Sequence, residues 1–339
     1  MRSSTSSSER VPGGPWLRTW LAALGLALAA LAAWDGFWRL QGHAPGVTED
    51  PLLWTLERKR LGSGPLAVAV LGDSRALTGI DLEVLQRELG SERPAQLAIE
   101  GSSPVPILVE LAGDETFRGL VLLAVNPVRL FEASAAGGRL PREYLERLRD
   151  SGAPFAALET RLSVLVQRAS ALRRSELSPL TLLRLRRWPE PRQVRQDRAL
   201  PIHYVRDARL RAMERATAAQ TRSLPQLEGE PRTAHLARIA RAVERIRSRG
   251  GEVVLVRMPS SGLPRQAERE RAPRERAWDA LVRASGAPAI HFEDHPDLAF
   301  ESPDGSHLDA ADSAAFTRAL ATHVRRLTRF QGTGRRSPE

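Results

Sequence analysis

The chain has 339 residues, of which 42% are hydrophobic and 27% charged, a composition typical of a globular protein and too apolar for a disordered one. It contains no cysteine, which excludes disulfides, thiol catalysis and thiolate metal sites.

The formal net charge is +10, and the positive excess lies in residues 161–250, which hold 21 arginines and 8 acidic residues. No nucleic-acid-binding motif accompanies this block. We interpret it as an arginine-rich helical surface and expect no nucleic-acid partner; the alternative is that it attracts nucleic acid, anionic lipid or an acidic polymer.

An uncharged stretch lies near the N-terminus, over residues 19–34. Tryptophans flank it at both ends, as in the aromatic belt of a membrane span; they are Trp16, Trp20, Trp34 and Trp38. Arginines precede the stretch, so residues 1–18 are expected to form a cytoplasmic tail. We predict an uncleaved, single-pass signal anchor over residues 19–38 in the cell membrane, with the rest of the protein extracytoplasmic. Because Ala30-Leu31-Ala32 resembles a cleavage site, a cleaved signal peptide is the alternative.

After a linker over residues 39–64, short apolar runs alternate with segments of helical periodicity. The runs predicted as strands are residues 66–71, 96–99, 119–125, 253–258 and 289–292. The predicted helices include residues 81–88, 106–111, 274–284 and 310–327. This alternation predicts a central five-stranded parallel sheet covered by helices on both faces. We therefore expect a flavodoxin-like three-layer α/β sandwich over residues 65–328.

One interval breaks the alternation, because about 125 residues separate the third and fourth predicted strands, far more than a crossover helix needs. We expect a helical insertion over about residues 132–250, lying as a cap near the strand ends and carrying most of the basic excess. Its predicted helices are residues 142–149, 155–172 and 234–249. The tail, residues 329–339, is expected to be disordered.

Polar residues follow the predicted strands at the sheet edge where open parallel sheets bind ligands. Ser74 follows the first strand, Gly101 the second and Asn126 the third. Asp304 and His307 lie just before the final helix. Acyl transfer at a serine needs a base, a carboxylate that orients the base, and donors for the oxyanion, and these residue types can fill those roles. The G-x-S-x-G sequence of α/β-hydrolases is absent.

Four segments, VLGDSR, AIEGSSP, LAVNP and PDGSHLD, resemble in order and spacing the four blocks of the SGNH/GDSL hydrolase family. The resemblance implies a flavodoxin-like fold in which Ser74 is the nucleophile and Asp304 and His307 complete a catalytic triad. It implies an oxyanion hole formed by the backbone N–H groups of Ser74 and Gly101 and the side-chain amide of Asn126. It covers residues 66–327 apart from the insertion, and the implied chemistry requires no metal or organic cofactor.

Two positions depart from the blocks of the family. The third block keeps only Asn126 of the usual Gly-x-Asn-Asp, and Arg75 follows the serine where lipase-type members often have leucine. With its anchor, the chain is similar to the envelope-modifying branch, whose members help acetylate alginate or D-alanylate teichoic acids. We expect a serine esterase or O-acyltransferase acting on acyl groups of a cell-envelope carbohydrate. The alternative is a non-catalytic module that binds an acidic polysaccharide or a partner protein in an envelope complex.

The segment HFEDH, residues 291–295, is a further candidate metal site, because His291, Glu293 and His295 would face the same way on a strand. The segment runs from the predicted strand into its terminal loop, where this alternation ends. We therefore predict no metal site and expect Asp294 to be a solvated polar residue near the active site. His203, in the basic insertion, is expected to be a surface or cap residue.

Overall fold

The computed structural model describes residues 16–41, 51–134, 138–152, 197–204 and 208–330, together with positions 162, 177, 182 and 183. The predicted helix over residues 155–172 lies outside these ranges, apart from position 162. Parts of three other predicted segments also lie outside them: residues 1–15 of the cytoplasmic tail, residues 42–50 of the linker and residues 331–339 of the C-terminal tail. The chain divides into two compact units. One comprises residues 1–46 and 166–191, and the other comprises residues 47–165 and 192–339.

The first unit contains helix α1, Trp16–Leu40, which includes the whole predicted anchor. This helix has 25 residues, and an 18-residue window within it has a mean hydropathy of 1.6, so it is long and apolar enough to cross a membrane. Near its C-terminal end, Trp34 Nε1 donates a hydrogen bond to the Leu177 carbonyl (3.3 Å), and Trp38 packs against the same leucine. Helix α1 is therefore compatible with a single-pass anchor or a signal sequence.

The second unit is built on five parallel strands in the order β2-β1-β3-β4-β5. They are β1 Val68–Leu71, β2 Ala95–Gln96, β3 Leu120–Ala124, β4 Glu252–Arg257 and β5 Ala289–His291. The predicted five-stranded parallel sheet is confirmed, and its order is that of flavodoxin-like folds. Strand β2 is shorter than predicted, but its pairing with β1 continues, because Ile99 N donates to the Gly72 carbonyl (3.1 Å).

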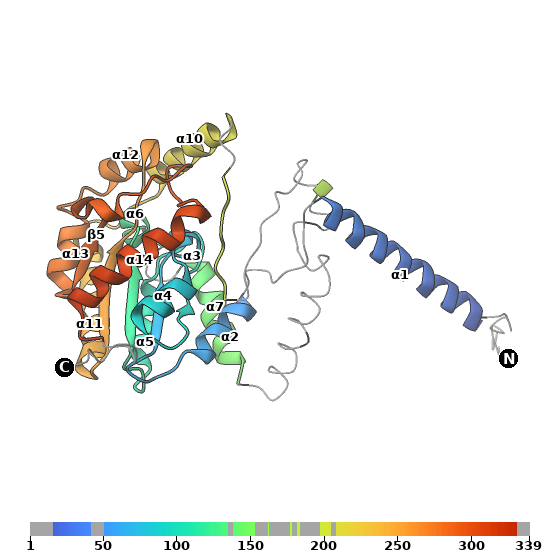
Figure 1. The fold of residues 1–339 in the computed structure, drawn as a ribbon, viewed down its shortest axis with the longest axis horizontal. Helices are drawn as coiled ribbons and strands as arrows, with labels where there is room; N and C mark the ends of the chain where they lie inside the picture. The colour runs from blue at the N-terminus through green and yellow to red at the C-terminus, as the bar shows by residue number, and fades with distance from the viewer. Residues whose placement is uncertain are drawn as a thin grey trace, which may run out of the picture. The chain divides into compact units, whose positions relative to one another are not determined.

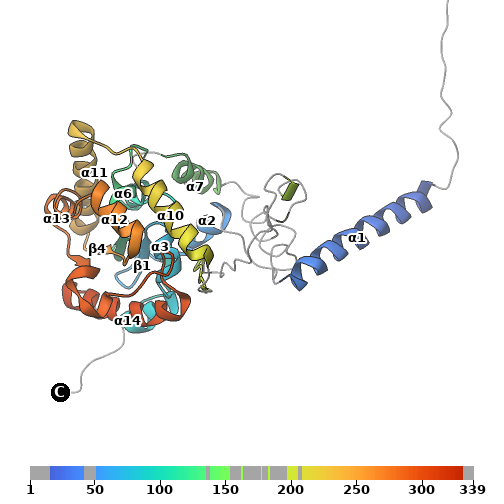
Figure 2. The ribbon, with the colours of Figure 1, turned by 90° about the horizontal axis from the view of Figure 1, so that it is seen from above.

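Helices cover both faces of the sheet, since successive strand residues point to opposite sides. One face, with Val68 and Val70, packs against α3 Ser74–Gly79, α4 Leu82–Leu89 and α14 Ala310–Leu327. The other face, with Ala69 and Leu71, packs against α2 Pro51–Arg60, α5 Val105–Gly113, α7 Arg139–Asp150, α11 Gly229–Ser248 and α13 Trp278–Ser285. Figure 2 shows α14 and α11 on opposite sides of β1 and β4.

Helix α11 is the crossover from β3 to β4. Its buried residues Ile239, Val243 and Ile246 belong to the core beneath the sheet. Residues 229–248, near the end of the stretch predicted as an insertion, are thus part of the α/β sandwich itself. The same connection holds the short helix α6 Pro127–Leu130 and helix α10 Ala208–Ser223.

Helix α10 lies along α12, Gly262–Arg271, which belongs to the connection from β4 to β5. Glu214 accepts a hydrogen bond from Leu263 N (2.8 Å), and Arg222 pairs with Glu270 (2.7 Å). Figure 1 shows both helices at one end of the domain. The connection after β5 holds two 3-10 turns, η3 Phe292–Asp294 and η4 Pro296–Leu298, before α14 begins.

Candidate active site

Ser74 is the first residue of α3, directly beyond the end of β1. Asp73 caps this helix, because its carboxylate accepts a hydrogen bond from Arg75 N (3.0 Å). Gly72 permits the close approach of β1 to β3 at this point: a Cβ on it would lie 2.7 Å from Ala76 Cβ and 2.9 Å from Ala124 Cβ. The tight turn therefore holds Ser74 at the carboxyl edge of the sheet.

The loop that carries Asp304 and His307 is fixed by its own backbone. Asp304 Oδ1 accepts hydrogen bonds from Ser306 N (2.8 Å) and His307 N (2.7 Å). Gly305 adopts φ +80°, and a Cβ on it would lie 2.5 Å from the Pro264 ring. Its carbonyl accepts a hydrogen bond from Ser261 N (3.0 Å). The loop is thus held against the segment that leads into α12.

Ser74, His307 and Asp304 form a continuous hydrogen-bonded set. His307 Nε2 lies 2.8 Å from Ser74 Oγ, and His307 Nδ1 lies 2.7 Å from Asp304 Oδ2. An ionised carboxylate only accepts hydrogen bonds, so Nδ1 carries a proton and Nε2 is the ring nitrogen that faces the serine hydroxyl. Burial raises the pKa of Asp304, but the hydrogen bonds and charge of His307 and two backbone N–H groups outweigh it and hold that pKa well below its usual range. The carboxylate is therefore ionised and orients the imidazole.

Tyr204 contacts the same carboxylate, a role that sequence reasoning missed. Its hydroxyl donates a hydrogen bond to Asp304 Oδ2 (2.8 Å), and its backbone N–H donates to Asp309 Oδ2 (3.1 Å). The segment is anchored upstream by Arg198, a fully buried residue that donates to the Ala98 carbonyl (2.9 Å). Nothing in the sequence around this tyrosine signals the contact, because it joins residues 100 positions apart.

Asn126 caps α6 at the end of β3. Its Oδ1 accepts hydrogen bonds from Val128 N (3.2 Å) and Arg129 N (3.4 Å), and its Nδ2 donates one to Asp73 Oδ2 (3.0 Å). The amide group carries two hydrogens. An oxyanion role for Asn126 therefore depends on the second one, since the first is directed at Asp73.

Gly101 lies in the turn that follows β2, at φ +67° and exposed to solvent. A Cβ on it would meet no atom within 4 Å, so the positive φ rather than crowding favours glycine here. Among the described residues, Gly101 shares no hydrogen bond with Ser74, His307 or Asp304. Its place in an oxyanion hole remains a prediction.

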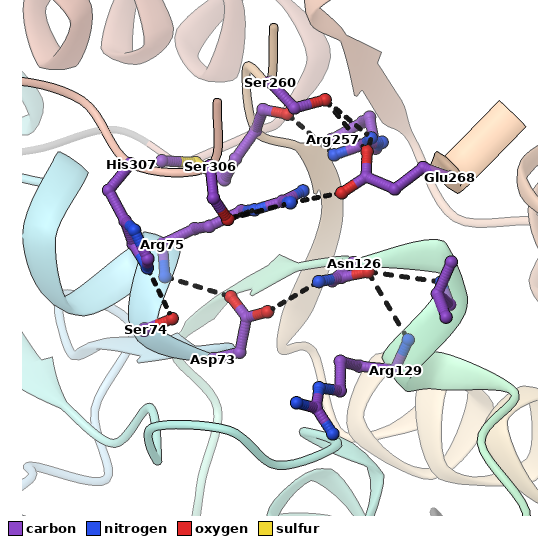
Figure 3. A network of polar contacts seen from close by, with 12 residues as sticks. Asp73, Ser74, Arg75, Asn126, Arg129, Arg257, Ser260, Glu268, Ser306 and His307 are labelled. Atoms are coloured by element: carbon purple, nitrogen blue, oxygen red, sulfur yellow. Dashed lines mark hydrogen bonds and ion pairs between the residues drawn. The ribbon is translucent and has the colours of Figure 1, made fainter. Parts of the chain in front are cut away.

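A buried charge cluster lies beside the serine and the histidine (Figure 3). The Arg75 guanidinium donates to Ser306 Oγ from Nε (3.2 Å) and Nη2 (3.1 Å), and Nη2 also pairs with Glu268 of α12. Glu268 pairs in addition with Arg257 at the end of β4, and it accepts from Ser260 Oγ (2.9 Å). All five side chains are buried. The cluster ties the turn after β1, the end of β4, helix α12 and the His307 loop together.

The electrostatics of this cluster follow from one carboxylate between two guanidinium groups. Burial raises the pKa of Glu268, but the charges of Arg75 and Arg257 lower it to about 2. Burial lowers the pKa of Arg75, but Glu268, Asp73 and Asp304 raise it above its ordinary value. Sequence reasoning noted Arg75 only as a departure from a motif. Arg257, which directly follows the apolar run of residues 253–256, was the one further signal in the sequence.

In the HFEDH segment, His291, Glu293 and His295 do not come together as one group of ligands. His291 is buried against Trp278, and its Nδ1 accepts a hydrogen bond from Glu293 N (3.2 Å). The Glu293 carboxylate pairs with Arg265 and Arg269. The side chains of His291 and Glu293 therefore have different partners. The His295 ring instead contacts the His323 ring.

Comparison with models of known protein families gives no match, and comparison with curated proteins gives none. One solved structure, titled "Crystal Structure of TesA", aligns with 77% of this chain and 99% of its own, at 14% identity and a TM-score of 0.35. A likeness at that identity and score carries no argument about chemistry, so the function is inferred from the residues and their geometry.

Proposed function

We propose that the chain is a serine acylhydrolase or O-acyltransferase of the SGNH/GDSL type, with Ser74, His307 and Asp304 as its catalytic triad. The observation that carries the proposal is the unbroken set of contacts from Ser74 Oγ through the imidazole to the Asp304 carboxylate, 2.8 Å and 2.7 Å long. These lengths match those of a nucleophile, its general base and the group that orients the base.

In the proposed reaction, His307 Nε2 takes the hydroxyl proton of Ser74 as Oγ attacks the acyl carbonyl. The tetrahedral intermediate collapses with cleavage of the ester C–O bond, and His307 returns the proton to the leaving alcohol. Water or a sugar hydroxyl then attacks the acyl-enzyme, with His307 as base. The second tetrahedral intermediate collapses with cleavage of the acyl C–O bond to Ser74, and His307 returns the proton to Ser74 Oγ. Asp304 stays ionised throughout and stabilises the imidazolium, as its lowered pKa requires.

The negative charge on the carbonyl oxygen needs donors in a site shielded from water. We assign this role to the backbone N–H groups of Ser74 and Gly101 and to the second amide hydrogen of Asn126. The Asn126 contact with Asp73 supports this assignment in part, because it fixes the orientation of the amide plane at the end of β3.

The proposed substrate is an acylated carbohydrate or a related ester of the cell envelope. Two features support it: the likeness of the four sequence blocks to the SGNH/GDSL family, and helix α1, which is compatible with a membrane anchor of the kind found on envelope-modifying members of that family. In this proposal α1 holds the catalytic domain on the extracytoplasmic side of the cell membrane. Transfer to another carbohydrate rather than to water would make the enzyme an O-acyltransferase.

The proposal is tested on the full chain in detergent with p-nitrophenyl acetate and a fluorophosphonate label. We expect labelling of Ser74, and loss of labelling and at least about a thousandfold lower turnover in Ser74→Ala and His307→Gln. Ser248→Ala, at the C-terminal end of α11, is the matched control and keeps both activities. A folded wild-type chain that is neither labelled nor active contradicts the proposal and favours the non-catalytic module, for which binding to an acidic polysaccharide is then measured.

A further inference from the structure

A group of metal-ligating side chains lies outside the proposed active site: His295, Asp297 and His323. We propose that these three residues bind one divalent transition-metal ion of the zinc class. The inference goes beyond the proposed function and stands whether or not Ser74 is a nucleophile.

The three side chains converge from two segments of the chain. His323 Nε2 lies 2.9 Å from Asp297 Oδ2 and 3.1 Å from Oδ1. The rings of His295 and His323 are in contact, with centroids 4.1 Å apart and an interplanar angle of 41°. One ligand atom from each residue lies within 4.8 Å of the other two. Two imidazoles and one carboxylate thus point at one small volume.

This set of donors suits a metal ion better than it suits a simple ion pair. An ion pair between His323 and Asp297 uses only one imidazole. It does not explain why the His295 ring lies against the His323 ring. Neutral imidazole nitrogens and a carboxylate oxygen are the ordinary zinc ligands. Bonds of about 2.0–2.2 Å in tetrahedral geometry place ligand atoms about 3.4 Å apart, so small ring rotations are enough to close the site.

The backbone on both sides of the cluster is well supported. His295 precedes Pro296, which begins η4, and its N–H donates to the Phe292 carbonyl (3.4 Å). His323 lies on α14, which buries Leu320 and Val324 in the core. The His323 side chain is only 12% exposed, whereas that of Asp297 is 54% exposed. The backbone that carries the two histidines is therefore held in place, and the open side at Asp297 admits the ion and a water molecule as the fourth ligand.

The ion would have a structural role. His323 lies 13 residues beyond Ala310, the first residue of α14, which is about 20 Å along the helix. Because α14 begins close to the His307 loop, the cluster lies far from Ser74. A bound ion would instead fasten the C-terminal half of α14 to η4. The HFEDH segment then contributes one ligand, His295, and its partners are two and 28 positions further along the chain.

The test uses the full chain in detergent after EDTA treatment and dialysis, with Zn²⁺ alone as the titrant and Co²⁺ as a spectroscopic substitute. We expect one equivalent of tightly bound Zn²⁺, a rise in the melting temperature on binding, and the absorption bands of tetrahedral Co²⁺. His323→Ala and His295→Ala are expected to weaken binding at least about tenfold, because loss of a group that only supports a ligand already costs about that much. Asp297→Asn is also expected to weaken binding. Because it keeps the shape of the side chain, it separates loss of a ligand from a folding defect.

The matched control is His203→Ala, which removes an exposed histidine outside the cluster. It is expected to bind Zn²⁺ and Co²⁺ as the wild type does. The proposal is overturned if the wild-type chain binds no Zn²⁺ at micromolar concentrations, or if all three cluster variants bind as tightly as the wild type. Retained esterase activity in the three variants separates this result from any failure of the proposed catalytic site.

Discussion

Arg75, the residue after Ser74, donates two hydrogen bonds to Ser306 Oγ, the residue before His307, at 3.2 and 3.1 Å. The two proposed catalytic side chains are thus joined by a direct contact between their sequence neighbours. Glu268 holds the same guanidinium from the opposite side. The distance between Ser74 and His307 therefore depends on a buried charge cluster as well as on the loops that carry them.

Ser306→Ala removes the acceptor of both Arg75 hydrogen bonds. We expect turnover of p-nitrophenyl acetate to fall about tenfold with little change in KM, because misplacement of the base affects the chemical step more than substrate binding. The free energy of unfolding should fall by about 1–3 kcal/mol, since Arg75 Nε is left buried without its partner. Steady-state kinetics and urea unfolding measure both effects. Wild-type turnover in this variant would show that the contact does not position the base.

Glu268→Gln leaves Arg75 and Arg257 buried side by side without their counter-charge. We expect a loss of about 3–5 kcal/mol in the free energy of unfolding, the usual cost of removing one member of a buried ion pair. Glu270→Gln, on the same helix, breaks an exposed pair with Arg222 and should change stability little. Urea unfolding of the full chain compares the two. Equal, small effects of both substitutions would contradict a structural role for the buried cluster.

Gly305→Ala tests the packing of the loop that carries Asp304 and His307. The new Cβ would lie 2.5 Å from the Pro264 ring, so the loop must move, and we expect at least about a tenfold slower fluorophosphonate reaction. Gly250→Ala is the matched control, because Gly250 also has a positive φ of +89° but a Cβ there meets nothing within 4 Å. The control is expected to lose only about 1–2 kcal/mol of folding stability, the cost of a left-handed backbone conformation for alanine, and to react with the fluorophosphonate as the wild type does. Equal reactivity of the two variants would count against this role of Gly305.

The lowered pKa of His291 predicts how the stability of the protein depends on pH. Burial, with the charges of Arg257 and Arg274, lowers its pKa from 6.5 to about 4 in the folded chain. Between these values the unfolded chain takes up the proton and the folded chain does not, so stability falls as the pH falls from about 6.5 to 4. Glu268, with a folded pKa of about 2, adds its own loss only below about 4.5.

The check is the melting temperature of the full chain in EDTA between pH 7 and pH 5. The wild-type value should decrease over this range, and His291→Asn, which removes the titrating ring but keeps an acceptor for Glu293 N, should decrease less. His203→Asn, at an exposed position, should follow the wild type. A His291→Asn curve parallel to that of the wild type would contradict this assignment.

Local patterns in the sequence determined most of the elements. The apolar stripe and the Asp309 cap of α14 predict its bounds as observed, Ala310–Leu327, because periodicity and capping involve neighbours along the chain. The five apolar runs likewise predict the five parallel strands. The motifs also singled out Ser74, Asp304 and His307, whose contacts are now observed and whose catalytic role is proposed.

Contacts between distant residues were decided by the tertiary structure alone. Glu268 meets Arg75 across 193 positions, Tyr204 meets Asp304 across 100, and His323 meets Asp297 across 26. Such pairs carry no local signature, since a charged residue on a helix has the same pattern of neighbours whether it faces water or a buried guanidinium. Only the order of the strands and the packing of helices on them determine which side chains share a buried volume.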